Sequence, residues 1–292
     1  MYELIQVGAK TYYINCPAKI GLYRINDTDI CLIDSGSDKS AAKKVLNVLD
    51  ENNWQLKMII NTHSHADHIG GNGYLQERTG CRIYCAGADL SFVKNPILEP
   101  SFLYGGYPFE NLRNKFLMAG ESKAEPLEES VLPKGLETIQ LDGHTFSMSA
   151  IKTDDDIWFL ADSLTDEGII AKYHIFYLVD VKRYLDSLDT IMQLKGRLFI
   201  PSHAEPVETV EDMVKVNREK INEVAKFLLD FCSEAKAFDD ILKGVFDNYD
   251  LKMNSNQYVL VGSTIKSYLS YLHDLKKLKI TFEENKMLWE KA

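Results

Sequence analysis

Short runs of hydrophobic residues alternate with polar turns through the first part of the chain. Compact apolar or alternating runs predict strands, and a longer stretch with apolar residues three or four positions apart predicts a helix. The predicted strands cover residues 11–15, 21–25, 30–33 and 57–60, and the predicted helix covers 39–52. Strands that lead into strand–helix–strand units predict an α/β fold.

A similar passage begins near Leu136. Strands are predicted at 137–141, 146–151, 157–161 and 198–200, and a helix is predicted at 181–194. The apolar run that starts at Asp29 ends on Asp34, and the one that starts at Asp156 ends on Asp162. The same order of predicted elements therefore occurs twice in the chain, and we expect two stacked α/β halves that meet at these strand ends.

The segment 89–133 between the halves is rich in Pro, Gly and aromatic residues. A long irregular segment inside a compact domain usually covers or lines a site, so this one is predicted to be an insert or lid. Its aromatic residues either form a wall of the substrate pocket or only pack the insert against the rest of the domain. They are Phe102, Tyr104, Tyr107 and Phe109. His174, after Lys172 and Tyr173, is a further candidate for the pocket edge, and the alternative is an ordinary surface or core histidine.

The pattern changes after Pro206. Helices are predicted at 207–231, 238–249 and 257–275, and a hairpin is predicted over 279–289. This order suggests a small, mainly helical, winged-helix-like domain over 208–292, following a catalytic domain over 1–207. The C-terminal part carries 13 Lys/Arg and 15 Asp/Glu, so it lacks the excess of positive charge that is typical of a DNA-binding domain. We expect it to be structural or to form a homodimer, with recruitment of a partner as the alternative.

Composition excludes several classes of protein. The net charge is -10, which disfavours binding to nucleic acid. No apolar run approaches the ~18 residues that span a bilayer, and no signal peptide is recognisable at the N-terminus. The five cysteines show no metal-ligand spacing and no disulfide framework. These features favour a cytoplasmic, globular protein with reduced thiols.

The chemistry is concentrated in the stretch from Asn61 to Gly71, directly after a predicted strand. It places His63, His65, Asp67 and His68 within six positions, so it holds three of the seven histidines in the chain. In an extended segment residues i and i+2 share a face, so the first two imidazoles can address one metal. The next two residues follow as the chain turns into a helix, where adjacent side chains diverge and can address a second metal.

Further metal-ligand candidates stand at strand ends or turns in the second half. They are His144, Asp162 and His203. Each alone is as well explained as a capping or surface group, but together they complete the donor set of a two-metal site. Asp34 at the end of the earlier strand is expected to accept a hydrogen bond from a ligand imidazole, and its alternative role is to cap the following turn.

The H-x-H-x-D-H stretch at 63–68, followed in order by Gly-His144, the strand-terminal Asp162 and Ser-His203, resembles the metallo-β-lactamase superfamily over roughly residues 1–207. The resemblance implies a four-layer αββα sandwich. It also implies that His63, His65 and His144 hold one metal, that Asp67, His68 and His203 hold the other, and that Asp162 bridges them. Asp67 and Asp162 are the implied catalytic carboxylates. The superfamily commonly has Pro and Gly where this chain has Asp142 and Ala161, which affects backbone shape rather than ligands.

The resemblance implies a dinuclear hydrolase that uses a metal-bridging hydroxide to cleave an ester, thioester or lactone of a small molecule. Imidazole and carboxylate ligands suit zinc, iron or manganese, and zinc is the default expectation. Alternatives are a mononuclear iron oxygenase resembling the persulfide dioxygenases and a phosphodiesterase of the same fold. The complete donor set disfavours the first, and the acidic charge disfavours the second.

Overall fold

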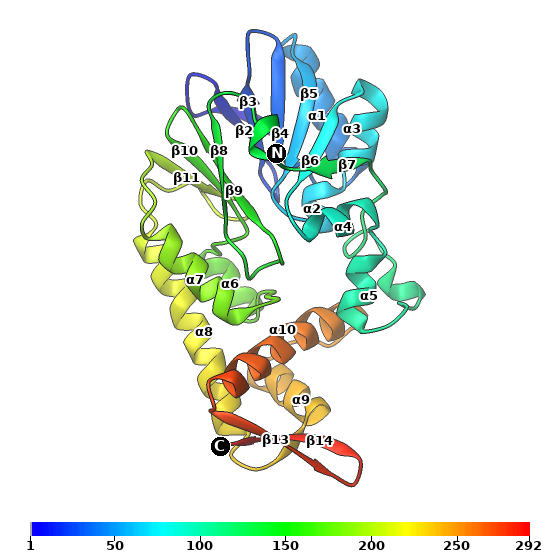
Figure 1. Ribbon diagram of the computed structural model, residues 1–292, viewed down its shortest axis with the longest axis vertical. Coiled ribbons are helices and arrows are strands. Elements are labelled where there is room, and N and C mark those ends of the chain that lie inside the picture. Colours follow the sequence, from blue (N-terminus) through cyan, green and yellow to red (C-terminus); the bar gives the residue numbers. More distant parts are fainter. Residues whose placement is uncertain (1) are drawn as a thin grey trace.

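The computed structural model describes residues 2–292 and shows two facing β-sheets with helices outside them, followed by a helical C-terminal part (Figure 1). The first sheet has seven strands in the order β1-β2-β3-β4-β5-β6-β7. It is antiparallel from β1 to β4 and parallel from β4 to β7. Its strands are β1 Glu3–Gln6, β2 Thr11–Asn15, β3 Ile20–Arg24, β4 Asp29–Ile33, β5 Gln55–Asn61, β6 Arg82–Cys85 and β7 Ala124–Pro126.

The second sheet has four strands in the order β11-β10-β9-β8. These strands are β8 Leu136–Gln140, β9 Ser149–Thr153, β10 Ile157–Ala161 and β11 Leu198–Pro201. Only β10 and β11 pair in parallel. An apolar layer that includes Tyr23 and Ile60 from one sheet and Ile151 and Phe159 from the other fills the space between the two sheets.

Helices cover both outer faces of this sandwich. Ala42, Val45 and Leu49 of α1 pack on the first sheet, and α7 and α8 belong to the core over the second sheet. The helices of this part are α1 Lys39–Glu51, α2 Ala66–Ile69, α3 Asn72–Thr79, α4 Asp89–Lys94, α5 Leu98–Tyr104, α6 Glu167–Tyr173, α7 Val181–Ile191 and α8 Glu211–Phe231. The expected α/β class with a helix–sheet–sheet–helix order is thus confirmed.

The local sequence accounts for where several helices begin. Asp38, Asp166, Asp180 and Asn254 each accept a hydrogen bond from a backbone N–H of the first turn of the helix that follows. Such caps satisfy donors that have no partner inside the helix. The predicted helix at 39–52 is observed as Lys39–Glu51 for this reason.

The segment 89–133 is more regular than predicted. It contains α4 and α5, two 3-10 turns, Glu110–Leu112 and Glu129–Val131, and strand β7. β7 pairs in parallel with β6 and extends the first sheet. Part of the predicted insert is therefore the edge of the sheet, and the part around α5 stands out from it (Figure 1).

The C-terminal part has the predicted helices and hairpin. It continues from α8 into β12 Lys236–Ala237, α9 Phe238–Asn248, α10 Ser255–Asp274, β13 Leu278–Glu283 and β14 Lys286–Lys291. The last two strands pair, and β12 joins them through β14. One hydrophobic core runs without a break from the outer face of the second sheet into this part, through Leu188, Ile221, Val245 and Leu269 among others.

All five cysteines are buried and free. Within residues 2–292, no helix combines the length and the apolar character needed to cross a membrane.

Candidate metal centre

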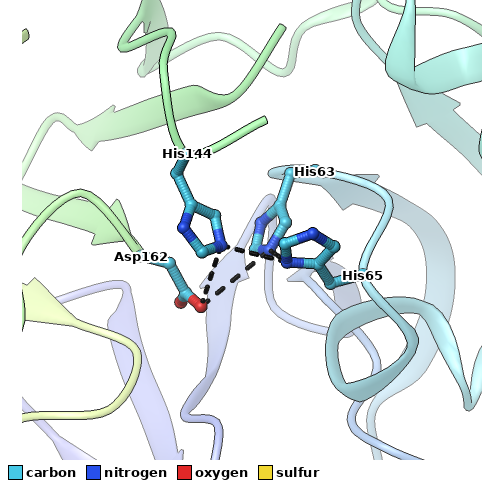
Figure 2. A group of neighbouring side chains, drawn as sticks. All are labelled: His63, His65, His144 and Asp162. Carbon is cyan, nitrogen blue, oxygen red and sulfur yellow. Dashed lines mark hydrogen bonds and ion pairs between the residues drawn. The ribbon is translucent and has the colours of Figure 1, made fainter. Parts of the chain in front are cut away.

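Three histidines converge at the edge where strands of the two sheets end (Figure 2). His63 and His65 lie between β5 and α2, and His144 lies on the turn after β8. The Nδ1 atom of His65 is 3.2 Å from Nε2 of His63 and 3.0 Å from Nε2 of His144. Together with Asp162, these residues offer donor atoms that all lie within 4.8 Å of one another. This first group is compact enough to hold one ion.

A second group lies beside it. Asp67, His68 and His203 also offer donor atoms within 4.8 Å of one another. The Nε2 atom of His203 is 3.2 Å from Oδ2 of Asp67, and Nε2 of His68 is 3.8 Å from the same oxygen. The structure therefore brings together all the residues that the sequence suggested as ligands.

Asp162 connects the two groups. Its Oδ1 is 3.2 Å from Nε2 of His68, while its Oδ2 is 3.2 Å from Nε2 of His203 and 3.5 Å from Nε2 of His144. The carboxylate comes directly after β10, where Ala161 has a φ of 52°. This left-handed conformation is the physical reason why a glycine suits the position before the carboxylate.

The polar atoms at the centre fit a divalent cation. Nε2 of His68 and Oδ1 of Asp162 are buried and, despite their separation of 3.2 Å, neither has a hydrogen-bond partner among the described residues. A buried polar atom without a partner is costly in free energy, and a bound cation would satisfy both atoms. Imidazole nitrogens and carboxylate oxygens are ordinary ligands of zinc, iron and manganese.

The ring nitrogens that face away from the centre are held by other groups. His68 is bonded through Nδ1 to Oδ2 of Asp34 at 2.8 Å. Nδ1 of His144 lies 3.0 Å from the carbonyl of Tyr177, and Nδ1 of His203 lies 2.8 Å from that of Pro17. Such partners fix the orientation of a ring and direct its other nitrogen to the centre.

Asp34 itself is held firmly in place. It is buried, it has a φ of 66°, and its two oxygens accept hydrogen bonds from the backbone N–H and hydroxyl of Thr62 at 2.8 and 2.7 Å. The sequence suggested either an imidazole partner or a cap for the following turn, and the contact with His68 is present.

Two carboxylates near the site were not found from the sequence. Buried Asp89 accepts hydrogen bonds from the hydroxyls of Ser64 and Thr145 and from the N–H of Ser147, so it ties the first histidine loop to the loop of His144. Glu99 of α5 places Oε1 3.7 Å from Nε2 of His65. Both residues stand in the irregular-looking segment, and no local pattern marks them.

The protonation of the imidazoles differs between the two groups. Burial, together with the neighbouring His144, lowers the pKa of His65 to about 3, and burial likewise lowers the pKa of His63 and His144. The carboxylate of Asp162 raises the pKa of His203 to about 10. The first group therefore offers neutral nitrogens with free lone pairs, whereas the second combines imidazoles with anionic oxygens.

A cavity of about 670 Å³ opens onto the centre, and we call it the metal-side cavity. His144, Asp162 and His203 form one side of it. The other lining residues come mainly from α6, α10 and the segments around them. They are Leu164, Thr165, Asp166, Gly168, Ile169, Lys172, Tyr173, Ile175, Phe176, Tyr177, Gln257, Leu260, Val261 and Thr264.

The candidate pocket residues from the sequence do not line this cavity. Tyr104 packs against Phe109, and Tyr107 is 73% exposed and lies beside Arg113. His174 stacks on Tyr249 with ring centroids 5.2 Å apart. Tyr104 and Tyr107 thus contact other residues of the insert at its surface, and His174 packs against the C-terminal part. The neighbouring Lys172 and Tyr173 do line the cavity.

The family model described as the metallo-beta-lactamase superfamily matches residues 14–203, which include every residue of both donor groups. The chain belongs to this superfamily.

Curated relatives match parts of the chain. A hydroxyacylglutathione hydrolase from Prochlorococcus marinus (strain MIT 9312) is 28% identical over 157 residues, which are 51% of this chain and 54% of the relative. A protein of the same name from Methylococcus capsulatus is 44% identical over 52 residues, 18% of this chain and 20% of the relative. The matches thus span about half or less of these superfamily members.

Solved structures of the superfamily share the fold along the whole chain. A beta-lactamase domain protein from Burkholderia ambifaria gives a TM-score of 0.79 at 15% identity, over 99% of this chain and 94% of that one. A metallo-beta-lactamase family protein from Thermus thermophilus gives a TM-score of 0.74 at 18% identity, over 99% of this chain and 98% of that one. The C-terminal part therefore has a structural counterpart in both proteins.

Proposed function

We propose that this protein is a dinuclear metal-dependent hydrolase that cleaves an ester, thioester or lactone bond of a small molecule. The observation that carries the proposal is the position of Asp162, whose two oxygens face His68 of one donor group and His144 of the other. A carboxylate between two adjacent groups of donors suits a pair of ions with a shared ligand. The donors suit zinc, iron and manganese alike, and zinc is the ion we propose as the default among them.

The proposed roles are those that the family resemblance implies, and the two donor groups support them. His63, His65 and His144 would hold one ion, Asp67, His68 and His203 would hold the other, and Asp162 would be shared. Bound divalent ions lower the pKa of water toward neutrality and polarise the oxygen of the substrate. The side chains of His203 and Asp67 are 30% and 44% exposed, so the substrate reaches the centre from their side.

An acyl substrate is supported by three features. The curated relatives that match parts of the chain are named hydroxyacylglutathione hydrolases, the net charge of -10 disfavours polyanionic substrates, and the cavity next to the centre is largely apolar. We further propose that residues 1–207 carry the chemistry and that 208–292 complete the cavity through α10. A homodimer formed through the C-terminal part remains a prediction.

The experiment is hydrolysis of a panel of thioesters, esters, lactones and phosphodiesters before and after removal of metal with a chelator. We expect turnover of acyl substrates that chelation abolishes and zinc restores. The variant Asp162→Asn, which weakens the shared ligand, should lose most of this turnover, whereas Asp156→Asn on the exposed turn before β10 serves as the matched control. Oxygen uptake with thiol or persulfide substrates and no hydrolysis would instead indicate the iron oxygenase.

A further inference from the structure

The metal-side cavity lies between two helices that are far apart in the sequence. Gln257, Leu260, Val261 and Thr264 line it from α10, at spacings of three and four residues that place them on one face of the helix. On the other side are residues of α6, among them Ile169. Residues of both α6 and α10 line this one cavity, so the C-terminal part, which is seen below the two sheets in Figure 1, provides a wall of the site.

Six apolar side chains line the cavity between these helices. They are Leu164, Ile169, Ile175, Phe176, Leu260 and Val261. Some of the polar groups are already bonded within the protein. The hydroxyl of Thr264 donates to the carbonyl of Leu260 at 3.0 Å and accepts from the N–H of Leu178 at 3.2 Å. This hydroxyl therefore has little capacity left for a polar ligand.

The charges of the cavity do not suit a polyanion. Among the residues that line it, Lys172 is the single lysine or arginine, and its ammonium lies 4.8 Å from the centre of the Tyr173 ring. An oxygen of Asp166 accepts the N–H of Ile169 as the cap of α6, so this carboxylate is engaged. Away from the metal centre, a ligand with several negative groups would find one lysine to pair with here.

We infer that the metal-side cavity binds an uncharged, mainly aliphatic acyl group, and that Leu260 and Ile169 determine the length of the group that fits. The inference rests on the proposed function for the reaction itself. A volume of about 670 Å³ lies within the range of small-molecule sites. Burial of each methylene in such a cavity increases the binding free energy enough to change kcat/KM about fourfold.

The test uses thioesters of N-acetylcysteamine with acetyl, butyryl and hexanoyl groups, and an adipoyl thioester as a charged analogue of the same length as hexanoyl. For the wild-type enzyme, kcat/KM should rise about fourfold per methylene from acetyl to hexanoyl. The adipoyl analogue should be at least about tenfold poorer than hexanoyl because its carboxylate must leave water.

Two variants fill the cavity from opposite walls. Leu260→Trp and Ile169→Trp should remove the preference for hexanoyl, so that the ratio of kcat/KM for hexanoyl to kcat/KM for acetyl falls toward one. Tyr258→Trp is the matched control, because Tyr258 is on the same helix but is 41% exposed and does not line the cavity. It should keep the full preference for longer groups.

Equal kcat/KM for all chain lengths, or an equal loss on every substrate in both filled variants, would overturn the inference. If no thioester, ester or lactone is hydrolysed, the proposed function fails, and binding of hexan-1-ol measured by calorimetry then tests the cavity by itself. Binding to the wild type and to Tyr258→Trp but not to Leu260→Trp would support an aliphatic site. Equal binding to all three proteins, or to none, would reject it.

Discussion

The orientation of each ligand imidazole at the centre depends on the group that its second ring nitrogen contacts. Because a histidine ring can turn about its side-chain bonds, the acceptor behind it decides which nitrogen is presented to the centre. For His68 this acceptor is the carboxylate of Asp34, and for His144 and His203 it is a backbone carbonyl. A side-chain acceptor can be removed by substitution, so Asp34 offers the clearest test at this scale.

Asp34→Asn should weaken metal binding about tenfold to a hundredfold, because the amide is a poorer acceptor for the His68 N–H. Competition with a chromophoric chelator measures the affinity, and Asp27→Asn on an exposed turn is the control. An affinity equal to that of the wild type would show that Asp34 acts only on the backbone of Thr62.

Ala161→Gly should leave stability unchanged or raise the free energy of unfolding by up to about 1 kcal/mol, because Ala161 has a φ of 52° that a side chain disfavours. The control is Ala171→Gly in the exposed part of α6, which should lose about 1 kcal/mol because glycine is a poor helix former. Urea denaturation compares the two variants. A loss at Ala161 as large as that at Ala171 would contradict the account.

Among the secondary-structure elements, strand ends place the candidate ligands, and contacts between loops hold these ligands close to one another. β10 is a buried run that ends directly before Asp162, and β5 ends two residues before His63, so this pattern is visible in the sequence. The hydrogen bonds that hold one loop against another are not, because they join residues such as Ser64 and Asp89 that only the fold brings together.

Asp89→Ala should lower the free energy of unfolding by about 3 kcal/mol, because it leaves three donors without their acceptor inside the protein. The same urea experiment measures it, and Asp27→Ala should change stability by less than about 0.5 kcal/mol. A comparably small effect at Asp89 would mean that water satisfies these donors.

The sequence could predict most of the fold and the donor residues for a physical reason. Apolar runs and their ends are local properties, and His63 to His68 are local to one loop. The metal-side cavity is not local, because it is made where α10 meets α6, nearly ninety positions earlier in the chain. For the same reason β7 was predicted to be part of an irregular insert, since its strand conformation depends on pairing with β6.

At the scale of the whole molecule, the C-terminal part is not an independent attachment. The core over the second sheet continues through α8 into α9 and α10, so the interface between the two parts is itself hydrophobic core. A division of the chain near residue 208 would expose this core to water, which is costly in free energy.

The full chain should therefore unfold in one cooperative transition. Circular dichroism at 222 nm and tryptophan fluorescence should report the same midpoint in urea, since Trp158 lies in the second sheet and Trp289 in the terminal hairpin. A fragment that ends at residue 207 should be aggregated or poorly folded. Two separated transitions, or a stable fragment, would contradict a shared core.

The central claim is that Asp162 joins two metal positions, and metal content tests it most directly. Protein purified without added metal should contain close to two ions per chain by elemental analysis, and His203→Ala should retain close to one, held by His63, His65, His144 and Asp162. A wild-type content of one ion per chain, unchanged in His203→Ala, would contradict the two-metal account.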